Sequence, residues 1–152
     1  MAVEQLLRTA RDPLAGPDET RSALQRLREC LEGGEAEEPL LTRGSRLDCL
    51  RLCAADSLSR GAAGQGAVRD ESFDRARGWL AKAERLVPQS SFVLKGYYFY
   101  LLGDLAQSAE YLDNAGEQSL ARAVGAGLVA YRRERFEEAL RLFREVYRRC
   151  RA

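Results

Sequence analysis

Four cysteines are the side chains of this sequence best suited to metal or redox chemistry: Cys30, Cys49, Cys53 and Cys150. Cys49 and Cys53 are four residues apart, a spacing that places both on one face of a helix. A structural zinc site needs four ligands, usually in closely spaced pairs of Cys or His, and the chain contains no His. We therefore predict that the cysteines are small buried hydrophobic residues in reduced form, and that the chain holds no metal.

Acid–base and nucleophilic catalysis also lack a candidate. Without His, the chain has neither the commonest general base nor the usual partner of a nucleophilic Ser or Cys. Adjacent acidic residues such as Glu137 and Glu138 project about 100° apart on a helix, so they cannot act on one substrate. The sequence contains neither a P-loop nor a glycine-rich dinucleotide motif after a strand. It therefore predicts a protein that is not an enzyme and has no cofactor.

Composition favours an all-helical intracellular protein. Strong helix formers dominate the 152 residues, only 4 of which are Pro, and the length suits one domain. The formal charge of +1 gives no general attraction to nucleic acid or membranes. No apolar run approaches the roughly 20 residues that cross a bilayer, and the first residues are too polar for a secretory signal.

The spacing of apolar residues predicts about eight helices with short connections. The expected ranges are 3–11, 18–32, 40 or 45 to 59, 71–87, 91–102, 105–115, 118–132 and 135–149. Asp18 is expected to cap the second helix, Pro88 to stop the fourth, and Asp104 with Gln107 to form a capping box on the sixth. Three glycines between Gly61 and Gly66 predict a flexible insertion over 61–70. The first two helices are expected to form a cap, residues 1–34.

The later helices form pairs that repeat along the chain. Small residues recur where two helices would cross closely, at Ala76, Ser108 and Ala139, which are 32 and 31 residues apart. The last two pairs also have a small residue in the first helix, Gly96 or Gly127, and large residues in the second, among them Leu112 and Phe143. This pattern is typical of tetratricopeptide (TPR) repeats. It predicts a right-handed solenoid of helical hairpins over residues 40–152.

In such a solenoid the first helices of the pairs line a concave groove. The repeat places these residues in it: Ser90, Val93, Tyr97, Tyr100, Leu101, Val124, Leu128, Tyr131 and Arg132. For some of them, Val93 and Val124 above all, a contact with the neighbouring repeat is the alternative. A groove of Val, Leu and Tyr favours an extended or helical segment of a partner protein. The Lys, Arg and Asn set with which chaperone adaptors of this class hold a terminal carboxylate is missing.

The last predicted helix combines apolar and basic residues. No polar helix follows to cover Leu140, Phe143 and Tyr147, so we expect a longer array, a partner at this end, or self-association of the isolated chain. Residues 132–151 contain eight Arg and four Glu. This excess suits a solvated helix face, with an acidic partner segment or a nucleic-acid backbone as alternatives. Nucleic acid is disfavoured because the aromatic residues of this region occupy repeat positions.

Residues 47–149 resemble the N-terminal repeats of the TPR scaffold subunit of the RNA polymerase II-associated factor (Paf) complex. Three segments carry the resemblance: RLDCLRLCAADSLSRGA (46–62), SFDRARGWLAKAERLVP (72–88) and AGLVAYRRERFEEALRLFREVYRR (126–149). The resemblance implies a nuclear, non-catalytic scaffold for transcription elongation, whose groove holds an extended segment of another Paf-complex subunit. Two other functions stay open: a TPR adaptor in a trafficking, cilium or ubiquitin-ligase assembly, and an RNA-binding helical repeat.

Overall fold

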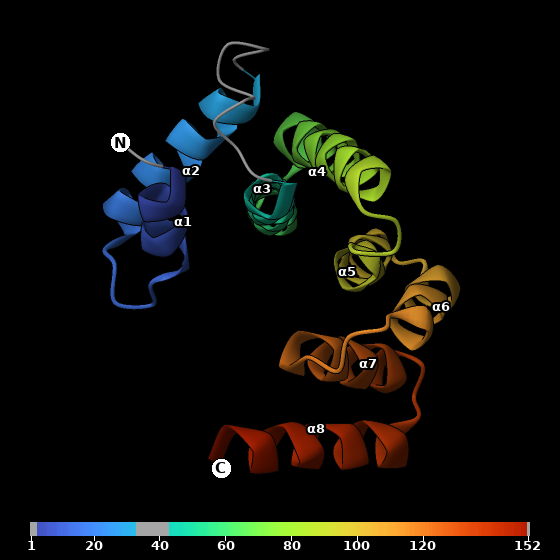
Figure 1. The fold of residues 1–152 in the computed structure, drawn as a ribbon. Helices are drawn as coiled ribbons and strands as arrows, with labels where there is room; N and C mark the ends of the chain where they lie inside the picture. The colour runs from blue at the N-terminus through green and yellow to red at the C-terminus, as the bar shows by residue number, and fades with distance from the viewer. Residues whose placement is uncertain (1–2, 33–42, 152) are drawn as a thin grey trace. The chain divides into compact units, whose positions relative to one another are not determined.

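The computed structural model describes residues 3–32 and 43–151, and all regular structure in these ranges is helical (Figure 1). The helices are α1 Val3–Arg11, α2 Pro17–Glu32, α3 Arg43–Ala63, α4 Gly66–Leu86, α5 Phe92–Leu102, α6 Leu105–Asn114, α7 Leu120–Arg132 and α8 Phe136–Arg151. The predicted all-α fold with about eight helices is confirmed. The assignment of these helices to a TPR-type solenoid stays a prediction.

The helices form two compact units, which we describe separately. Unit 1 is Met1–Pro88 and contains α1 to α4, and unit 2 is Gln89–Ala152 and contains α5 to α8. The sequence suggested another division, into a cap at 1–34 and repeats at 40–152. That division by repeat type stays a prediction.

Most helix ends follow the local signals in the sequence. The backbone N–H of Gln107 donates to Asp104 Oδ1 at 3.1 Å, so the predicted cap of α6 is present. α4 ends at Leu86, two residues before Pro88, as expected for a residue that cannot continue a helix. Ser119 caps α7 in the same way as Asp104 caps α6, by accepting from the N–H of Arg122 at 3.1 Å.

The predicted cap of α2 is wrong by two positions. The helix begins at Pro17, and the first helical hydrogen bond runs from the N–H of Thr20 to the Gly16 carbonyl at 3.0 Å. Asp18 therefore lies in the first turn instead of before it. Proline suits the first helical position because its fixed φ is already helical and its missing N–H has no partner to lose.

The flexible insertion expected over 61–70 is not a loop in the structure. α3 continues to Ala63 and α4 begins at Gly66, so two residues link them. Gly61 is buried where α3 crosses α4: a Cβ atom there would lie 2.6 Å from Cε1 of Phe73. Gly66 has φ +58°, which lets the chain reverse direction between the two helices. These glycines serve close packing and a tight turn.

Unit 1 is built around α3, which packs against α1, α2 and α4 (Figure 1). Its buried residues are Cys49, Leu50, Cys53, Ala54, Ser57, Leu58 and Gly61. Leu6, Leu7 and Leu27 of α1 and α2 cover one side of this helix around Cys49. On the other side α4 contributes its own buried residues: Phe73, Ala76, Trp79, Leu80 and Ala83.

Unit 2 contains two hairpins, α5–α6 and α7–α8, that use equivalent contacts. A Cβ atom at Gly96 would lie 2.6 Å from Leu112 Cγ, and one at Gly127 would lie 2.6 Å from Phe143 Cε1. Both glycines and both large residues are 31 residues apart. The same contact of a glycine with a large side chain is therefore present in both hairpins, and the hairpins stack through contacts of α6 and α5 with α7.

The α3–α4 hairpin does not repeat this contact. Ala76 is fully buried, as its equivalence to Ser108 predicts. However, the position 32 residues before Gly96 is Gly64, which lies in the link between the helices. α3 and α4 are each 21 residues long and cross at Gly61 and Phe73 instead.

Candidate functional site

The structure brings part of the predicted groove together on α5 and α7. The Arg132 guanidinium carbon lies 5.3 Å from the centre of the Tyr100 ring, so the end of α7 contacts α5. Earlier along the same helices, the Tyr97 hydroxyl donates to the Ala121 carbonyl. Burial raises the pKa of Tyr97 despite a backbone hydrogen bond at Gly125 that lowers it. Tyr97 thus ties α5 to α7.

Val93 is not a groove residue. It is 4% exposed and packs with Leu112, Ala115 and Val129 in the core of unit 2. This packing supports the alternative prediction, in which Val93 contacts the neighbouring hairpin. The other small or aliphatic members of the predicted set are half-buried: Ser90, Leu101, Val124 and Leu128.

Tyr131 does not join Tyr100. Its ring makes an edge contact with Phe136 at the start of α8, with 5.5 Å between the ring centres. Tyr131 and Arg132 are neighbours on a helix and therefore point in different directions, one toward α8 and the other toward α5. The predicted set is divided between two surfaces of unit 2.

A strip of exposed apolar side chains begins at Tyr131 and continues along α8. We call it the α8 strip, and its members are Tyr131, Phe136, Leu140 and Tyr147, which are 58%, 56%, 51% and 61% exposed. The three residues on α8 are four and seven positions apart, so they share one face of the helix. The expectation that this helix leaves apolar residues uncovered is confirmed among the described residues. Phe143, by contrast, is half-buried against Gly127.

The cysteines are free thiols, and only two of them are buried as predicted. Cys49 and Cys53 are 0% and 1% exposed. Burial raises the pKa of Cys49 to about 12, with the neighbouring Cys53, Cys30 and Asp48 adding to the rise. Burial also raises the pKa of Cys53 to about 11, against the opposing effect of Arg28. Cys150 is exposed on the last turns of α8, so its predicted burial is wrong.

We expect alkylation of the native protein to separate the cysteines. The thiolate is the reactive species, and at pH 8 a thiol with a pKa near 11 is about 0.1% ionised. Iodoacetamide at that pH is therefore expected to modify Cys150 first and to leave Cys49 and Cys53 unmodified until urea is added. Mass spectrometry of tryptic peptides with time gives the order. Labelling of Cys49 at the rate of Cys150 would contradict the burial of α3.

A second surface, which the sequence did not reveal, lies in unit 1. It is a cleft whose walls are α2 and α4 and whose floor is α3, formed by three cavities of 880, 430 and 310 Å³. Arg28 and Arg75 line both of the first two cavities and Lys82 lines both of the last two, so neighbouring cavities adjoin at these side chains. We call this surface the α2–α4 cleft. Periodicity within one helix cannot predict it, because its residues come from three helices.

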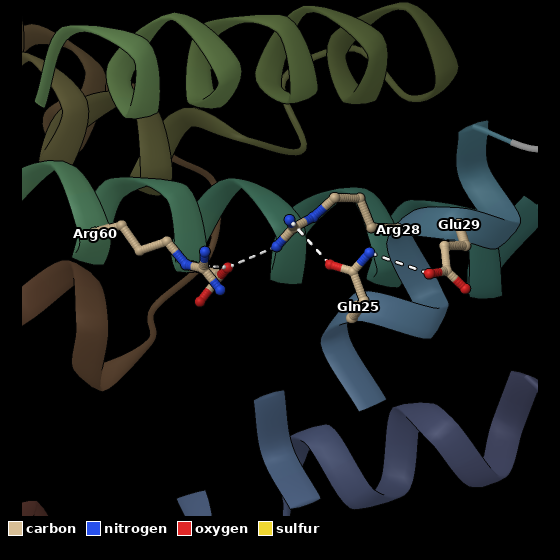
Figure 2. Close-up of polar contacts among 5 residues, drawn as sticks. Gln25, Arg28, Glu29 and Arg60 are labelled. Carbon is tan, nitrogen blue, oxygen red and sulfur yellow. Dashed lines mark hydrogen bonds and ion pairs between the residues drawn. The ribbon is translucent and has the colours of Figure 1, made fainter. Parts of the chain in front are cut away.

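A chain of hydrogen bonds fixes one arginine in this cleft. Arg28 donates from Nη2 to Asp56 Oδ2 at 3.0 Å and from Nη1 to Gln25 Oε1 at 3.3 Å. Gln25 donates in turn to Glu29 at 3.1 Å, as Figure 2 shows. Arg60 adds a second contact to Asp56 Oδ2, at 3.1 Å from its Nε. The Arg28 and Asp56 side chains are only 13% and 17% exposed, so this is a largely buried ion pair.

Within residues 3–32 and 43–151, no group of three or more His, Cys, Asp or Glu side chains is arranged to hold a metal ion. In the same part of the chain, no helix combines the length and the apolar character needed to span a membrane.

No protein-family model, no curated protein and no solved structure matches this chain. The surfaces described above are therefore the basis for assigning a function.

Proposed function

We propose that this chain is a non-catalytic protein-interaction scaffold, and that unit 2 binds a segment of a partner protein. The α8 strip carries the proposal. Its four large side chains are each more than half exposed, although each has apolar area that is more stable when removed from water. Contiguous apolar surface of this kind commonly marks a protein-binding site. Tyr is also common at such sites, since it combines a rigid apolar ring with a polar hydroxyl.

Basic residues beside the α8 strip indicate that the partner carries acidic residues there. Arg144 lies four residues after Leu140 and three before Tyr147, which places it next to the strip on α8. The Arg151 guanidinium carbon lies 5.5 Å from the centre of the Tyr147 ring. An amphipathic partner helix with apolar residues on one face and acidic residues at its edge would match this arrangement.

The specific form that we propose is a subunit of a transcription-elongation complex associated with RNA polymerase II, located in the nucleus. The support is the resemblance of residues 47–149 to the Paf-complex scaffold subunit, together with the two equivalent hairpins of unit 2. An adaptor of an unrelated assembly is the alternative, because helical hairpins of this kind occur in many scaffolds.

RNA binding by the arginines of α8 is the weaker alternative. Arg149 donates to the Gln118 carbonyl at 2.8 Å, and Arg148 lies 3.7 Å from Glu145. Arg151 donates to the Tyr147 hydroxyl at 3.3 Å. These contacts give several of the arginines a role inside unit 2. RNA binding would weaken steeply as salt rises from about 50 to about 200 mM, which is a simple test.

Affinity capture from nuclear extract tests the proposal. The wild-type chain is expected to recover subunits of an elongation complex, whereas Leu140→Glu with Tyr147→Glu is expected to lose them. Both residues are exposed, so the double variant should keep its helical circular dichroism. Leu102→Glu is the matched control, since Leu102 is 46% exposed but lies on α5, outside the strip.

The outcomes separate the alternatives. Recovery of a different assembly that the strip variant also loses would favour the adaptor function. If the strip variant and the Leu102→Glu control retain the same proteins, the α8 strip is not the binding site. Capture that depends on RNA and disappears at moderate salt would favour the RNA-binding alternative.

A further inference from the structure

We propose that the α2–α4 cleft of unit 1 binds an acidic segment of a partner protein, with carboxylates on its arginines and apolar side chains between them. This extends the scaffold function to a second surface. The two proposals can fail separately, because one depends on residues of unit 2 and the other on residues of unit 1.

The dimensions of the cleft suit an extended peptide. Its α4 wall reaches from Val68 to Leu86, about 27 Å at the rise of a helix. An extended chain covers that length with about eight residues. The middle cavity lies between α2 and α4, with Arg28 and Glu32 on one wall and Arg75 and Lys82 on the other.

The charge of the residues that line the cleft indicates that the bound partner segment is acidic. The basic residues that line the cleft are Arg21 and Arg28 of α2, Arg46 and Arg60 of α3, and Arg75, Lys82 and Arg85 of α4. Three acidic residues, Glu32, Asp56 and Glu71, also line it, so the described residues of the cleft have four more basic than acidic side chains. The whole chain has a net charge of only +1, so this excess is local. Guanidinium groups match carboxylates in a two-point geometry, which lysines do not.

Arg28 and Arg60 give the cleft a fixed point of recognition. Both contact the same oxygen of Asp56, so one carboxylate serves two guanidinium groups. Arg28 donates to both Gln25 and Asp56, which fixes its guanidinium group, and Figure 2 shows Gln25 next to it. A charged group that is already held in place loses little conformational freedom when a ligand binds. We assign Arg28 and Arg60 the recognition of one carboxylate of the segment.

The apolar lining distinguishes a peptide from a nucleic acid. Leu24, Leu31 and Leu86 are half-buried residues of the cleft walls, and Val68 is 61% exposed. Trp79 is the one Trp of the chain, but it is 6% exposed and the Lys82 ammonium lies 4.9 Å from its ring centre. It therefore offers no open ring on which a base could stack. Leucine-sized side chains alternating with carboxylates fit this lining better.

Fluorescence anisotropy with a defined probe tests the proposal. The probe is a fluorescein-labelled peptide of about twelve residues, two thirds Glu and Asp and one third Leu, which exceeds the length of the cleft. Arg75→Glu with Lys82→Glu is expected to weaken its binding roughly tenfold or more, because attraction becomes repulsion on one wall. The same peptide with Gln and Asn in place of the acids is expected not to bind.

Arg26→Glu with Arg77→Glu is the matched control. These two arginines also lie on α2 and α4, but they do not line any of the three cavities. Their ion pairs are comparable, because Arg77 lies 3.2 Å from Asp74 and Arg75 lies 3.0 Å from Glu71. The control is expected to change the dissociation constant less than about twofold, the effect of exposed charges screened by salt. Circular dichroism checks that both variants fold.

Three outcomes would overturn the assignment. Equal weakening in the cleft variant and its control would show binding by overall charge alone. No saturable binding up to about 1 mM of the peptide would show that the cleft is not a peptide site. Tighter binding of an oligo(dT) strand, lost in the cleft variant, would show that the cleft binds nucleic acid. Affinity capture by the α8 strip is expected to be unchanged in the cleft variant.

Discussion

Replacing Gly96 by alanine is expected to lower the free energy of unfolding by about 1–2 kcal/mol. The added Cβ would lie 2.6 Å from Leu112 Cγ and 2.8 Å from its Cδ2. Forcing an extra carbon into a packed core costs about 1–3 kcal/mol, and alanine returns about 0.5–1 kcal/mol because it favours helices. The overpacking is the larger effect, so the variant should be less stable.

Leu112 has little room to move away. It is 2% exposed and packs in the core of unit 2 with Val93, Ala115 and Val129. Gly127→Ala is expected to lower the free energy of unfolding less than Gly96→Ala does, even though its Cβ atom would also lie 2.6 Å from a neighbouring side chain. That neighbour is the Phe143 ring, which is only half-buried and can therefore shift toward solvent more easily than Leu112.

Gly78 provides the matched control for both variants. It also lies inside a helix, but nothing is within 4 Å of its Cβ position and the residue is exposed. Gly78→Ala is therefore expected to raise the free energy of unfolding by about 0.5–1 kcal/mol. Urea unfolding followed by circular dichroism measures all three. A Gly96→Ala variant as stable as Gly78→Ala would show that α5 and α6 do not approach as closely as described.

The sequence marks both partners of this contact, although not their pairing, because each lies at a position of the repeated pattern. Gly96 with Leu112 and Gly127 with Phe143 recur at 31 residues, and each pair joins the two helices of one hairpin. Two helix ends were predictable for a similar reason, since Pro88 and Asp104 act on their nearest neighbours in the chain, whereas the cap expected at Asp18 was misplaced. Features that depend on local or periodic signals can be read without knowing the fold.

Features that depend on tertiary contacts could not be read in this way. Gly61 and Gly66 predict a flexible loop when only their conformational freedom is considered, but Gly61 is required by the proximity of Phe73. Val93 has the spacing of a groove residue and lies in the core, because α7 covers it through Val129. The α2–α4 cleft had no signal at all, since its arginines are distributed over residues 21–85 and converge only after three helices pack.

Asp56→Ala is expected to destabilise unit 1 by about 2–3 kcal/mol. The carboxylate contacts Arg28 and Arg60, and its removal leaves the largely buried Arg28 guanidinium without an opposite charge. Such a loss costs about 3–5 kcal/mol when both groups are fully buried. The remaining exposure and the contact with Gln25 reduce it here. Fluorescence of Trp79, the one Trp of the chain and a residue of α4, reports unfolding of unit 1 directly.

Asp48→Ala, on the same helix, is the control for the stability effect of Asp56→Ala. Asp48 lies 2.8 Å from Arg11, a shorter contact than the one between Asp56 and Arg28, but the two side chains are 38% and 51% exposed. Solvent screens such a pair, so its loss is expected to cost about 0–1 kcal/mol. Equal destabilisation by the two substitutions would show that burial does not strengthen the Asp56 contacts.

A double substitution separates stability from binding at this position. Replacing a buried ion pair by apolar residues of similar size is often neutral, because neither charge has to be removed from water. Arg28→Met with Asp56→Leu is therefore expected to unfold within about 1 kcal/mol of the wild type. It is also expected to bind the acidic peptide at least about tenfold more weakly, since Arg28 is gone and Arg60 has lost the group that positions it. A stable double variant that still binds the peptide would show that the ion pair only supports the fold of unit 1.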